Sequence, residues 1–321
     1  MKALPRIPLA ALPTPVQPLP RLSEELGFTL LVKRDDLTGL AFGGNKVRKL
    51  EYLLADAQAQ EADVVVTTGA AQSNHCRQTA GAAAKLGLGC RLVLTTPRRP
   101  SGNLLLDGLL GARVTWAAPE ARAQALAQAV AEEAAQGRRP YRIPYGGSSP
   151  LGAAAYAYAL EELLSQGVTP DTIVFASSSG GTQAGLVAGA RLLGFRGRIL
   201  GISIQEPAPT LREQVAVLAS QTAALLGTPT TFRDTEIFVS DAYAKAGYGV
   251  VTDAEINAIL RFARAEGLFL DPVYTGRAAA ALLDLAAQGD FMPQETVLFW
   301  HTGGTPALFA TDYAQTLAAA A

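Results

Sequence analysis

The chain has 321 residues, of which 49% are hydrophobic and 17% charged, a composition typical of a globular protein with a large core and unlike that of a disordered chain. Its formal net charge of −1 does not favour nucleic acid or an anionic membrane surface as a partner. No apolar run is long enough to span a bilayer, and the proline-interrupted start lacks the apolar stretch of a signal peptide. Because Cys76 and Cys90 are the only cysteines and no export signal precedes them, we expect a cytoplasmic protein with reduced thiols.

Strand and helix patterns alternate along most of the chain. Short apolar runs rich in β-branched residues predict strands at 28–34, 63–68, 91–96, 113–116, 172–176, 199–204 and 297–300. Helical spacing of apolar residues predicts helices from about residue 46 and at about 77–87, 103–111, 118–137, 152–166 and 182–194. This alternation predicts an α/β fold of two doubly wound lobes with mostly parallel sheets. In such folds ligands bind beyond the carboxyl ends of strands, in the crevice between lobes.

The turn S-S-S-G-G-T-Q-A-G at 177–185 follows one predicted strand and opens a helix. Its small residues let backbone N–H groups converge at a helix N-terminus, which suits a phosphate group. It matches neither the G-x-G-x-x-G pattern nor a Walker A loop, because Leu186 follows Gly185 where a lysine would stand. Taken alone, it is equally well interpreted as a glycine-rich turn that binds nothing.

A second polar turn, A-A-Q-S-N-H-C-R-Q-T at 70–79, also follows a predicted strand. Ser73 or Asn74 can cap the helix that begins here, yet the turn holds more polar groups than a cap requires. His75 and Cys76 raise the question of a metal site. Because His75 and His301 are the only histidines and no second ligand pair has suitable spacing, we expect no zinc.

A third turn, G-L-A-F-G-G-N-K-V-R-K-L at 39–50, places three cations at a predicted helix start. The simplest interpretation is a glycine turn followed by a helix whose Lys46, Arg48 and Lys49 are solvated. Lys46, however, lies in the first turn, where the helix dipole disfavours a cation and should lower the pKa of the amine. Lys46 is therefore a candidate nucleophile for a Schiff base. Tyr248 and Tyr274 also stand in glycine-containing turns, where a core or rim position is the more usual role.

Six ordered segments resemble the D-cysteine desulfhydrase and 1-aminocyclopropane-1-carboxylate deaminase family of enzymes, which depend on pyridoxal 5'-phosphate (PLP). They are L-V-K-R-D-D-L-T-G-L-A-F-G-G-N-K-V-R-K-L-E, Q-S-N-H-C-R-Q-T-A, S-G-G-T-Q-A-G, A-G-Y-G-V, L-D-P-V-Y-T-G-R and H-T-G-G-T-P-A-L-F. The resemblance runs from about Leu12 to Phe309 and implies PLP fold type II, the tryptophan synthase β-like architecture. It also implies a small amino-acid substrate and a homodimer. We expect a larger PLP-binding domain of residues 1–46 and 155–321 and a smaller α/β domain of residues 47–154.

The resemblance assigns roles position by position. It implies that Lys46 forms the Schiff base with PLP and that Lys49 contacts its phosphate, whereas Arg48 points elsewhere and is expected to be a helix-surface charge. Asn74 would hydrogen-bond the phenolic oxygen of PLP, and Ser73 would contact the substrate carboxylate or shuttle protons. The remaining implied residues are Tyr248 and Tyr274, on the substrate side of the ring, and a phosphate cup of Ser178, Ser179, Gly180, Gly181 and Thr182.

Thr275 is the position that separates the two branches of the family. The deaminases have a glutamate there, beside the pyridine nitrogen, whereas this chain has threonine as the desulfhydrases do. A neutral hydroxyl stabilises a pyridinium far less than a carboxylate would, so ring opening of a cyclopropane is disfavoured. We therefore expect β-elimination of D-cysteine to pyruvate, hydrogen sulfide and ammonia. Gln183 departs from this pattern, because the desulfhydrases have histidine there. The alternatives are L-cysteate sulfo-lyase, the cyclopropane deaminase and, less favoured, a non-catalytic small-molecule-binding protein.

Overall fold

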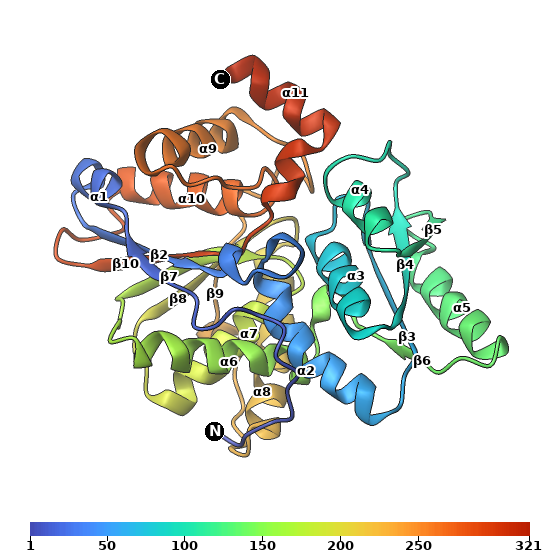
Figure 1. The fold of residues 1–321 in the computed structure, drawn as a ribbon. Coiled ribbons are helices and arrows are strands. Elements are labelled where there is room, and N and C mark those ends of the chain that lie inside the picture. Colours follow the sequence, from blue (N-terminus) through green and yellow to red (C-terminus); the bar gives the residue numbers. More distant parts are fainter.

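The computed structural model describes all 321 residues, which form two α/β units lying side by side (Figure 1). The larger unit is built on a six-stranded sheet in the order β1-β2-β10-β7-β8-β9, and the smaller on a four-stranded sheet in the order β5-β4-β3-β6. All strand pairs are parallel except β1 and β2. The predicted α/β class with two mostly parallel sheets is confirmed.

Helices cover both faces of the larger sheet (Figure 1). Its strands are β1 (Val16–Pro18), β2 (Thr29–Arg34), β7 (Thr172–Ser177), β8 (Arg198–Ser203), β9 (Phe238–Ser240) and β10 (Thr296–His301). One face carries α1 (Pro20–Leu26), α9 (Asp253–Glu266) and α10 (Thr275–Ala287), with α11 (Thr311–Ala320) beyond them. The other carries α6 (Pro150–Ser165), α7 (Gly181–Leu193) and α8 (Ala208–Leu225). Every residue of β7 is buried, as expected of a central parallel strand covered on both faces.

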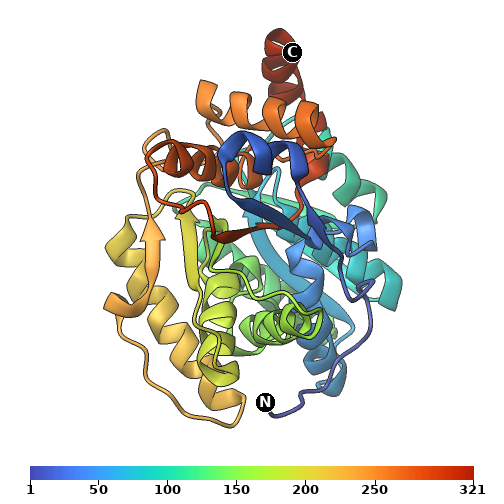
Figure 2. The same ribbon diagram turned by 90° about the vertical axis from the view of Figure 1, so that its left-hand side faces the viewer.

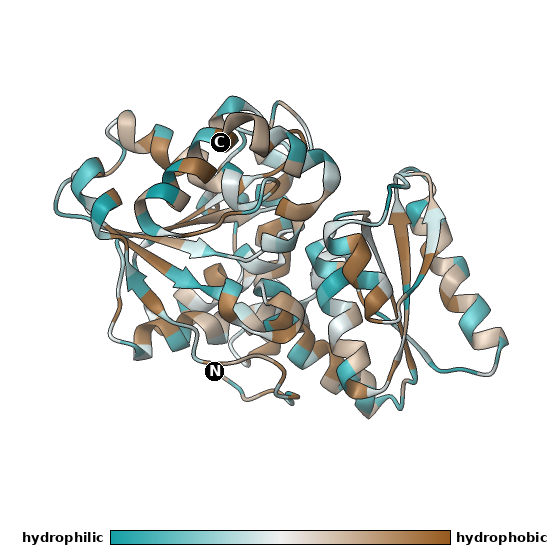
Figure 3. Ribbon diagram, turned by 45° about the horizontal axis from the view of Figure 1, so that its top comes forward, coloured by the Kyte–Doolittle hydropathy of each residue, from teal (hydrophilic) through white to brown (hydrophobic).

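The smaller unit repeats this arrangement on a smaller scale. Its strands are β3 (Val64–Ala70), β4 (Gly89–Thr95), β5 (Arg113–Ala117) and β6 (Pro140–Arg142). The helices α2 (Asn45–Ala59), α3 (Asn74–Leu86) and α4 (Gly102–Leu109) pack their apolar side chains on one face. The helix α5 (Arg122–Ala135) covers the other face through Leu126 and Ala129. In Figure 3 the strands of both sheets are largely hydrophobic and the covering helices carry most of the hydrophilic positions.

Each strand predicted from the sequence is present, with ends shifted by one or two residues. The strands that the pattern missed, β1, β6 and β9, have three residues each, too few to establish a period. The helices α1, α8, α9, α10 and α11 were also not predicted. Both sheets lie within the segments expected for the two domains, whose boundaries stay a prediction. A bilayer-spanning helix is not found, since none combines the required length with sufficient apolar character.

The N-terminal arm crosses the outside of the larger unit, and the two chain ends lie at opposite ends of the molecule (Figure 2). The arm is fastened to α2 by Ile7, whose N–H donates to the backbone of Glu51, and by Leu9, whose N–H donates to the Glu51 carboxylate. Further along, Thr14 donates through its N–H to Glu162 of α6. The arm therefore connects α2, which carries the candidate lysines, to α6.

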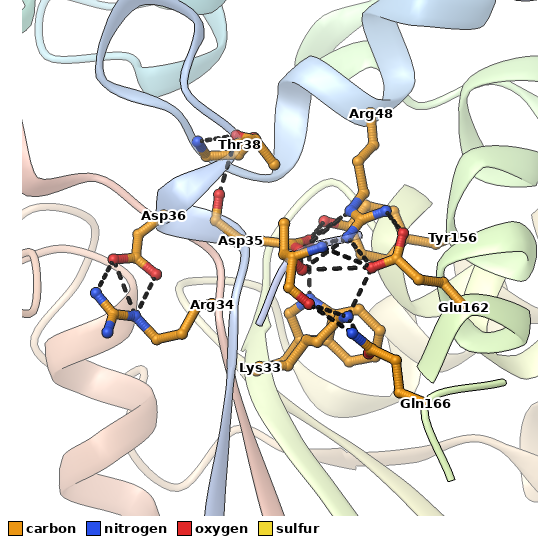
Figure 4. A network of polar contacts seen from close by, with 12 residues as sticks. Lys33, Arg34, Asp35, Asp36, Thr38, Arg48, Tyr156, Glu162 and Gln166 are labelled. Carbon is orange, nitrogen blue, oxygen red and sulfur yellow. Dashed lines mark hydrogen bonds and ion pairs between the residues drawn. The ribbon is translucent and has the colours of Figure 1, made fainter. Parts of the chain in front are cut away.

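A buried ionic network lies where the arm, β2, α2 and α6 meet (Figure 4). Asp35, fully buried directly after β2, accepts two hydrogen bonds from Arg48 Nε at 3.0 and 3.1 Å and one from Trp300 Nε1 at 2.8 Å. Burial opposes ionisation of Asp35, but the Arg48 guanidinium and the hydrogen bonds around the carboxylate outweigh it and hold its pKa below the usual value. Other members of the network are Thr14, Lys33, Tyr156, Glu162 and Gln166.

The expectation that Arg48 is a helix-surface charge is wrong. Its side chain is only 3% exposed and is paired with Asp35 and with Glu162 at 2.8 Å. Apolar periodicity could not reveal this, because the partners lie 13 positions earlier and 114 positions later in the chain. Arg48 does point away from the candidate lysines, as the resemblance implied.

We predict that Asp35→Asn strongly destabilises the protein. The substitution leaves the Arg48 guanidinium buried with one carboxylate fewer, and breaking a buried ion pair costs about 3 kcal/mol or more. A urea unfolding curve followed by circular dichroism should show a clearly lower midpoint.

The matched control is Asp36→Asn, one residue along the chain. Asp36 pairs with Arg34 at 2.7 Å, but both side chains are partly exposed, and such pairs contribute at most about 1 kcal/mol. An equal loss of stability in the two variants would contradict this prediction, because it would show that the buried ion pair contributes no more than the partly exposed one.

Candidate active site

A mostly polar cavity lies between the two units, at the carboxyl ends of strands from both sheets. Only three of its fifteen lining residues are hydrophobic, and no carboxylate is among them. The lining comes from the starts of α2, α3 and α7, the end of β7, the turns after β6, β7 and β10, and the residue before α10. Its members are Asn45, Lys46, Ser73, Asn74, His75, Tyr145, Gly146, Ala176, Ser177, Ser178, Ser179, Gly180, Thr182, Tyr274 and Thr302. The cavity suits a polar, negatively charged ligand.

Two lysines of α2 converge at this cavity. Lys46 and Lys49 are one helical turn apart and therefore share a face, and each Nζ donates to the Gly146 carbonyl oxygen at 3.2 Å. Burial lowers the pKa of Lys46 to about 8. Burial, and then the neighbouring Lys46 ammonium, hold the pKa of Lys49 well below its usual range. The direction predicted for Lys46 agrees, but burial and not the helix dipole is the largest cause.

A small-residue cup forms at the start of α7. Gly180 precedes the helix with φ of 74°, a conformation that favours glycine. Ser148 Oγ lies 2.8 Å from Ser179 Oγ and accepts the Gly181 N–H at 3.2 Å. A Cβ on Gly181 would collide with Ser148 Oγ and lie 2.8 Å from Lys49 Nζ. The cup is therefore open only because residue 181 has no side chain.

The start of α3 supplies the opposite wall. Ser73 Oγ accepts the Cys76 N–H at 3.2 Å, which confirms its capping interpretation, and Ser73 also lines the cavity. Asn74 Oδ1 accepts from Asn103 Nδ2 at 2.8 Å. Since this bond occupies the amide oxygen, the Asn74 amino group is left as the donor on the cavity side. Asn103 was not singled out in the sequence, because its α4 position shows no link to Asn74.

His75 also lines the cavity, although its sequence context pointed only to the rejected metal site. Thr67 Oγ1 donates to the Ile143 carbonyl and lies 2.9 Å from His75 Nε2. With its one proton so engaged, Thr67 accepts from Nε2–H, which leaves His75 Nδ1 unprotonated. That atom is buried without a partner. Burial, together with the charges of Lys46 and Lys49, holds the pKa of His75 well below its usual range, so the ring is neutral.

The two candidate tyrosines meet at the rim. Tyr274 lines the cavity, and its hydroxyl lies 2.7 Å from that of Tyr248, which lines the adjoining outer cleft with Gly249 and Tyr313. Burial raises the pKa of both phenols, so both are protonated at neutral pH. One of the pair donates to the other, which leaves one hydroxyl proton free for a ligand.

Thr275 is not brought to the cavity lining. Its hydroxyl donates to Asp271 Oδ1 and accepts the Asp271 N–H, both at 2.7 Å, within a fully buried turn. Gly304 packs against the same turn, where an added Cβ would lie 2.6 Å from Asp271 Cγ. The structure therefore brings Lys46, Ser73, Asn74, Tyr274 and most of the cup (Ser178, Ser179, Gly180 and Thr182) to the cavity lining. Lys49 and Gly181 lie next to this lining but are not part of it. Tyr248 contacts Tyr274, and Thr275 faces Asp271 in its own turn.

Two glycine turns support the lysine turn by direct backbone contact. A Cβ on Gly303 would lie 2.6 Å from Gly44 Cα, so the turn after β10 and the turn before α2 touch main chain to main chain. The Asn45 N–H donates to the Thr302 carbonyl at 2.9 Å across this junction. The contact fixes where α2, and with it Lys46, begins.

Comparison with known proteins agrees with this geometry. The family model described as pyridoxal-phosphate dependent enzyme matches residues 7–303. The chain is 42% identical to the D-cysteine desulfhydrase of Salmonella typhi over 320 residues, covering 95% of this chain and 96% of that protein. It is 43% identical to a provisionally named 1-aminocyclopropane-1-carboxylate deaminase of Pyrococcus abyssi, covering 96% and 94% respectively. The crystal structure of an ACC deaminase homologue superposes with a TM-score of 0.91 at 41% identity, covering 98% of this chain and 96% of that one.

More distant structures share the fold alone, among them the serine racemase of maize, with a TM-score of 0.65 at 19% identity and coverage of 91% and 88%. Fold and family model together define a PLP-dependent enzyme of fold type II, as expected. Within that class, the chain belongs to the ACC deaminase/D-cysteine desulfhydrase family.

The residues present fit PLP. Two lysine amines converge without a carboxylate between them, which favours a dianionic phosphate. Ser177 Oγ and His75 Nδ1 are buried polar atoms without partners beside the same cavity, and such atoms call for a polar ligand. The cup at α7 adds backbone N–H groups at a helix N-terminus.

We predict that Lys46 in cofactor-free protein is an unusually reactive amine near neutral pH. Only the neutral amine reacts with acetic anhydride, so a pKa of about 8 should give half-maximal labelling near pH 8, with more reaction above and less below. Peptide mass spectrometry as a function of pH measures this. In the urea-unfolded chain the same lysine should titrate near its ordinary value of 10.5, and coinciding curves would contradict the prediction.

Proposed function

We propose that this enzyme is a lyase that converts D-cysteine and water to pyruvate, hydrogen sulfide and ammonia by β-elimination. The observation that carries the proposal is the absence of a carboxylate from the cavity lining. A carboxylate beside the pyridine nitrogen would strengthen the electron sink that cyclopropane opening requires. β-Elimination requires less of the ring, because thiolate is a good leaving group.

The residues that would hold PLP line the cavity or lie directly beside it. Lys46 would be joined to the cofactor, Lys49 and the segment from Ser178 to Thr182 would bind its phosphate, and the Asn74 amino group would reach its phenolic oxygen. Bound there, PLP supplies an electron sink that stabilises negative charge at the substrate Cα. Thr275 faces Asp271, so its contact with the ring would depend on a rearrangement of that turn.

The remaining steps belong to the chain's own groups. Lys46, with a pKa of about 8, is suited to take a proton from Cα and return it near neutral pH. Tyr274 holds a phenol proton at the cavity, backed by Tyr248, and can donate it to the departing sulfur. Ser73, at the N-terminus of α3, is placed to bind the substrate carboxylate, which the helix dipole also favours.

Gln183 is weaker evidence for deaminase activity than its match to the deaminase branch suggested. Its amide is fully buried, donates to the Phe238 carbonyl at 2.7 Å and packs against Gly201, away from the cavity. The residue typical of the deaminase branch therefore does not contact the substrate space. L-Cysteate sulfo-lyase and cyclopropane deaminase activities are the alternatives, and the homodimer is a further proposal that light scattering would test.

We predict that Lys46→Ala abolishes turnover. It should also remove the yellow colour that the protein has when the cofactor is covalently bound. Loss of the residue that moves the Cα proton should lower kcat by about 10³-fold or more. Visible absorbance and a pyruvate assay measure the two effects. Lys85→Ala, at an exposed lysine in the last turn of α3, is the control and should change neither. Retention of colour and turnover in Lys46→Ala would sink the assignment.

A substrate panel tests the reaction itself. Release of ammonia and of the 2-oxo acid should be measured for D-cysteine, L-cysteine, L-cysteate and 1-aminocyclopropane-1-carboxylate, with sulfide release as a second readout for the two cysteines. We expect the highest kcat/KM for D-cysteine. A higher value for the cyclopropane amino acid, which lacks a thiolate to expel, would refute the argument from the carboxylate-free lining.

A further inference from the structure

Tyr248 stands in a segment with little support of its own. Residues 241–251 form consecutive turns outside any helix or strand, and the two backbone hydrogen bonds donated within them, from Ala244 and Gly247, close local turns only. Gly247 and Gly249, with φ of 90° and 74°, flank Tyr248 on both sides. Because glycine favours neither side of the φ map, this local sequence does not fix the direction of the tyrosine.

One side chain from α10 holds the segment on both sides of Tyr248. Arg277, with no exposed surface, donates through Nη1 to the Gly247 carbonyl at 3.0 Å and through Nη2 to the Val250 carbonyl at 2.8 Å. Its Nη1 also donates to the Ile204 carbonyl at 2.6 Å, at the end of β8. The planar guanidinium thus bridges the tyrosine segment to the sheet.

The charge of this guanidinium is compensated in place. Arg277 Nε donates to Glu255 Oε1 at 2.7 Å, and Glu255 lies in the first turn of α9, where its other oxygen accepts the Thr252 N–H at 2.9 Å. A buried arginine needs such a partner. The ion pair holds the Arg277 guanidinium in one orientation, so the Gly247 and Val250 carbonyls accept hydrogen bonds from a rigid donor.

Arg277 also lies close in the chain to the partner tyrosine, Tyr274. Tyr274 immediately precedes α10, three residues before Arg277, and its hydroxyl lies 2.7 Å from that of Tyr248. We propose that Arg277 is a positioning residue that sets the contact between the Tyr248 and Tyr274 hydroxyls. The inference rests on the proposed function, in which this pair delivers a proton. Arg277 is not among the residues that line the cavity, so it acts through Tyr248.

Arg277→Lys is the informative substitution. An ammonium keeps the charge opposite Glu255 but cannot span the Gly247 and Val250 carbonyls as the guanidinium fork does. Tyr248 should then lose its fixed place while the cofactor contacts on α2 and α7 persist. In the holoenzyme we expect kcat to fall about tenfold or more, in the range of a lost acid–base contribution, with the cofactor absorbance unchanged.

A double-mutant cycle separates this role from a general structural one. We expect Tyr248→Phe to lower kcat, and Arg277→Lys to add little in the Tyr248→Phe background, because both act through the same hydroxyl. Full additivity would overturn the proposal. Arg261→Lys is the control, since Arg261 pairs with Glu25 at 2.9 Å on the outer side of α9, and it should leave kcat unchanged.

A second measurement does not depend on the reaction. Nitration by tetranitromethane, mapped by mass spectrometry, should rise several-fold at Tyr248 in Arg277→Lys and stay unchanged at the remote, fully buried Tyr156. An unchanged rate at Tyr248 would overturn the positioning role. Increased nitration with an undiminished kcat in Tyr248→Phe would instead overturn the proton role in the proposed function. If Arg277→Lys does not fold, Glu255→Gln, which weakens the anchor of the same guanidinium, takes its place with the same expected outcomes.

Discussion

The buried contact between Asp35 and Arg48 is the constraint on which the site depends. Arg48 lies two residues beyond Lys46, on nearly the opposite face of α2, so its attachment to the larger unit directs both candidate lysines towards the cavity. The rest of α2 packs into the core of the smaller unit through Val47, Leu50 and Leu54. The helix α2 thus packs into the smaller unit and is also bonded to the larger one. The ionic network determines how the first turn of α2 is oriented.

Burial also accounts for the chemistry of the cavity. The Lys46 and Lys49 amines are buried, share one carbonyl oxygen and have no carboxylate beside them, so a positive charge on both is electrostatically unfavourable. Burial is the main cause of both lowered pKa values, and for Lys49 the neighbouring Lys46 ammonium lowers the pKa further. A phosphate near Lys49 would remove the repulsion and leave Lys46 as the amine that changes protonation. The same environment keeps His75 neutral, so its bare Nδ1 can only accept a hydrogen bond.

The sequence indicated where the chemistry lies, because parallel strands bring their carboxyl-end turns together and because those turns carry small and polar residues in distinctive order. It failed where a residue's role depends on distant partners. Arg48 looked like a surface cation, since nothing local marks Asp35 and Glu162 as its neighbours. Asn103 and the Gly146 carbonyl were missed for the same reason. At Thr275 the family role implied by the sequence stays a prediction, because the hydroxyl bonds Asp271 within its own turn.

The contact between Gly44 and Gly303 joins two segments that are synthesised far apart in time. The lysine turn is synthesised well before the turn at Gly303 on which it rests, so Lys46 should reach its final place only after β10 and the turn after it have formed. We therefore expect that a nascent chain does not hold the cofactor before residue 303 has emerged from the ribosome. A fragment that ends before residue 303 should not acquire the colour of the bound cofactor.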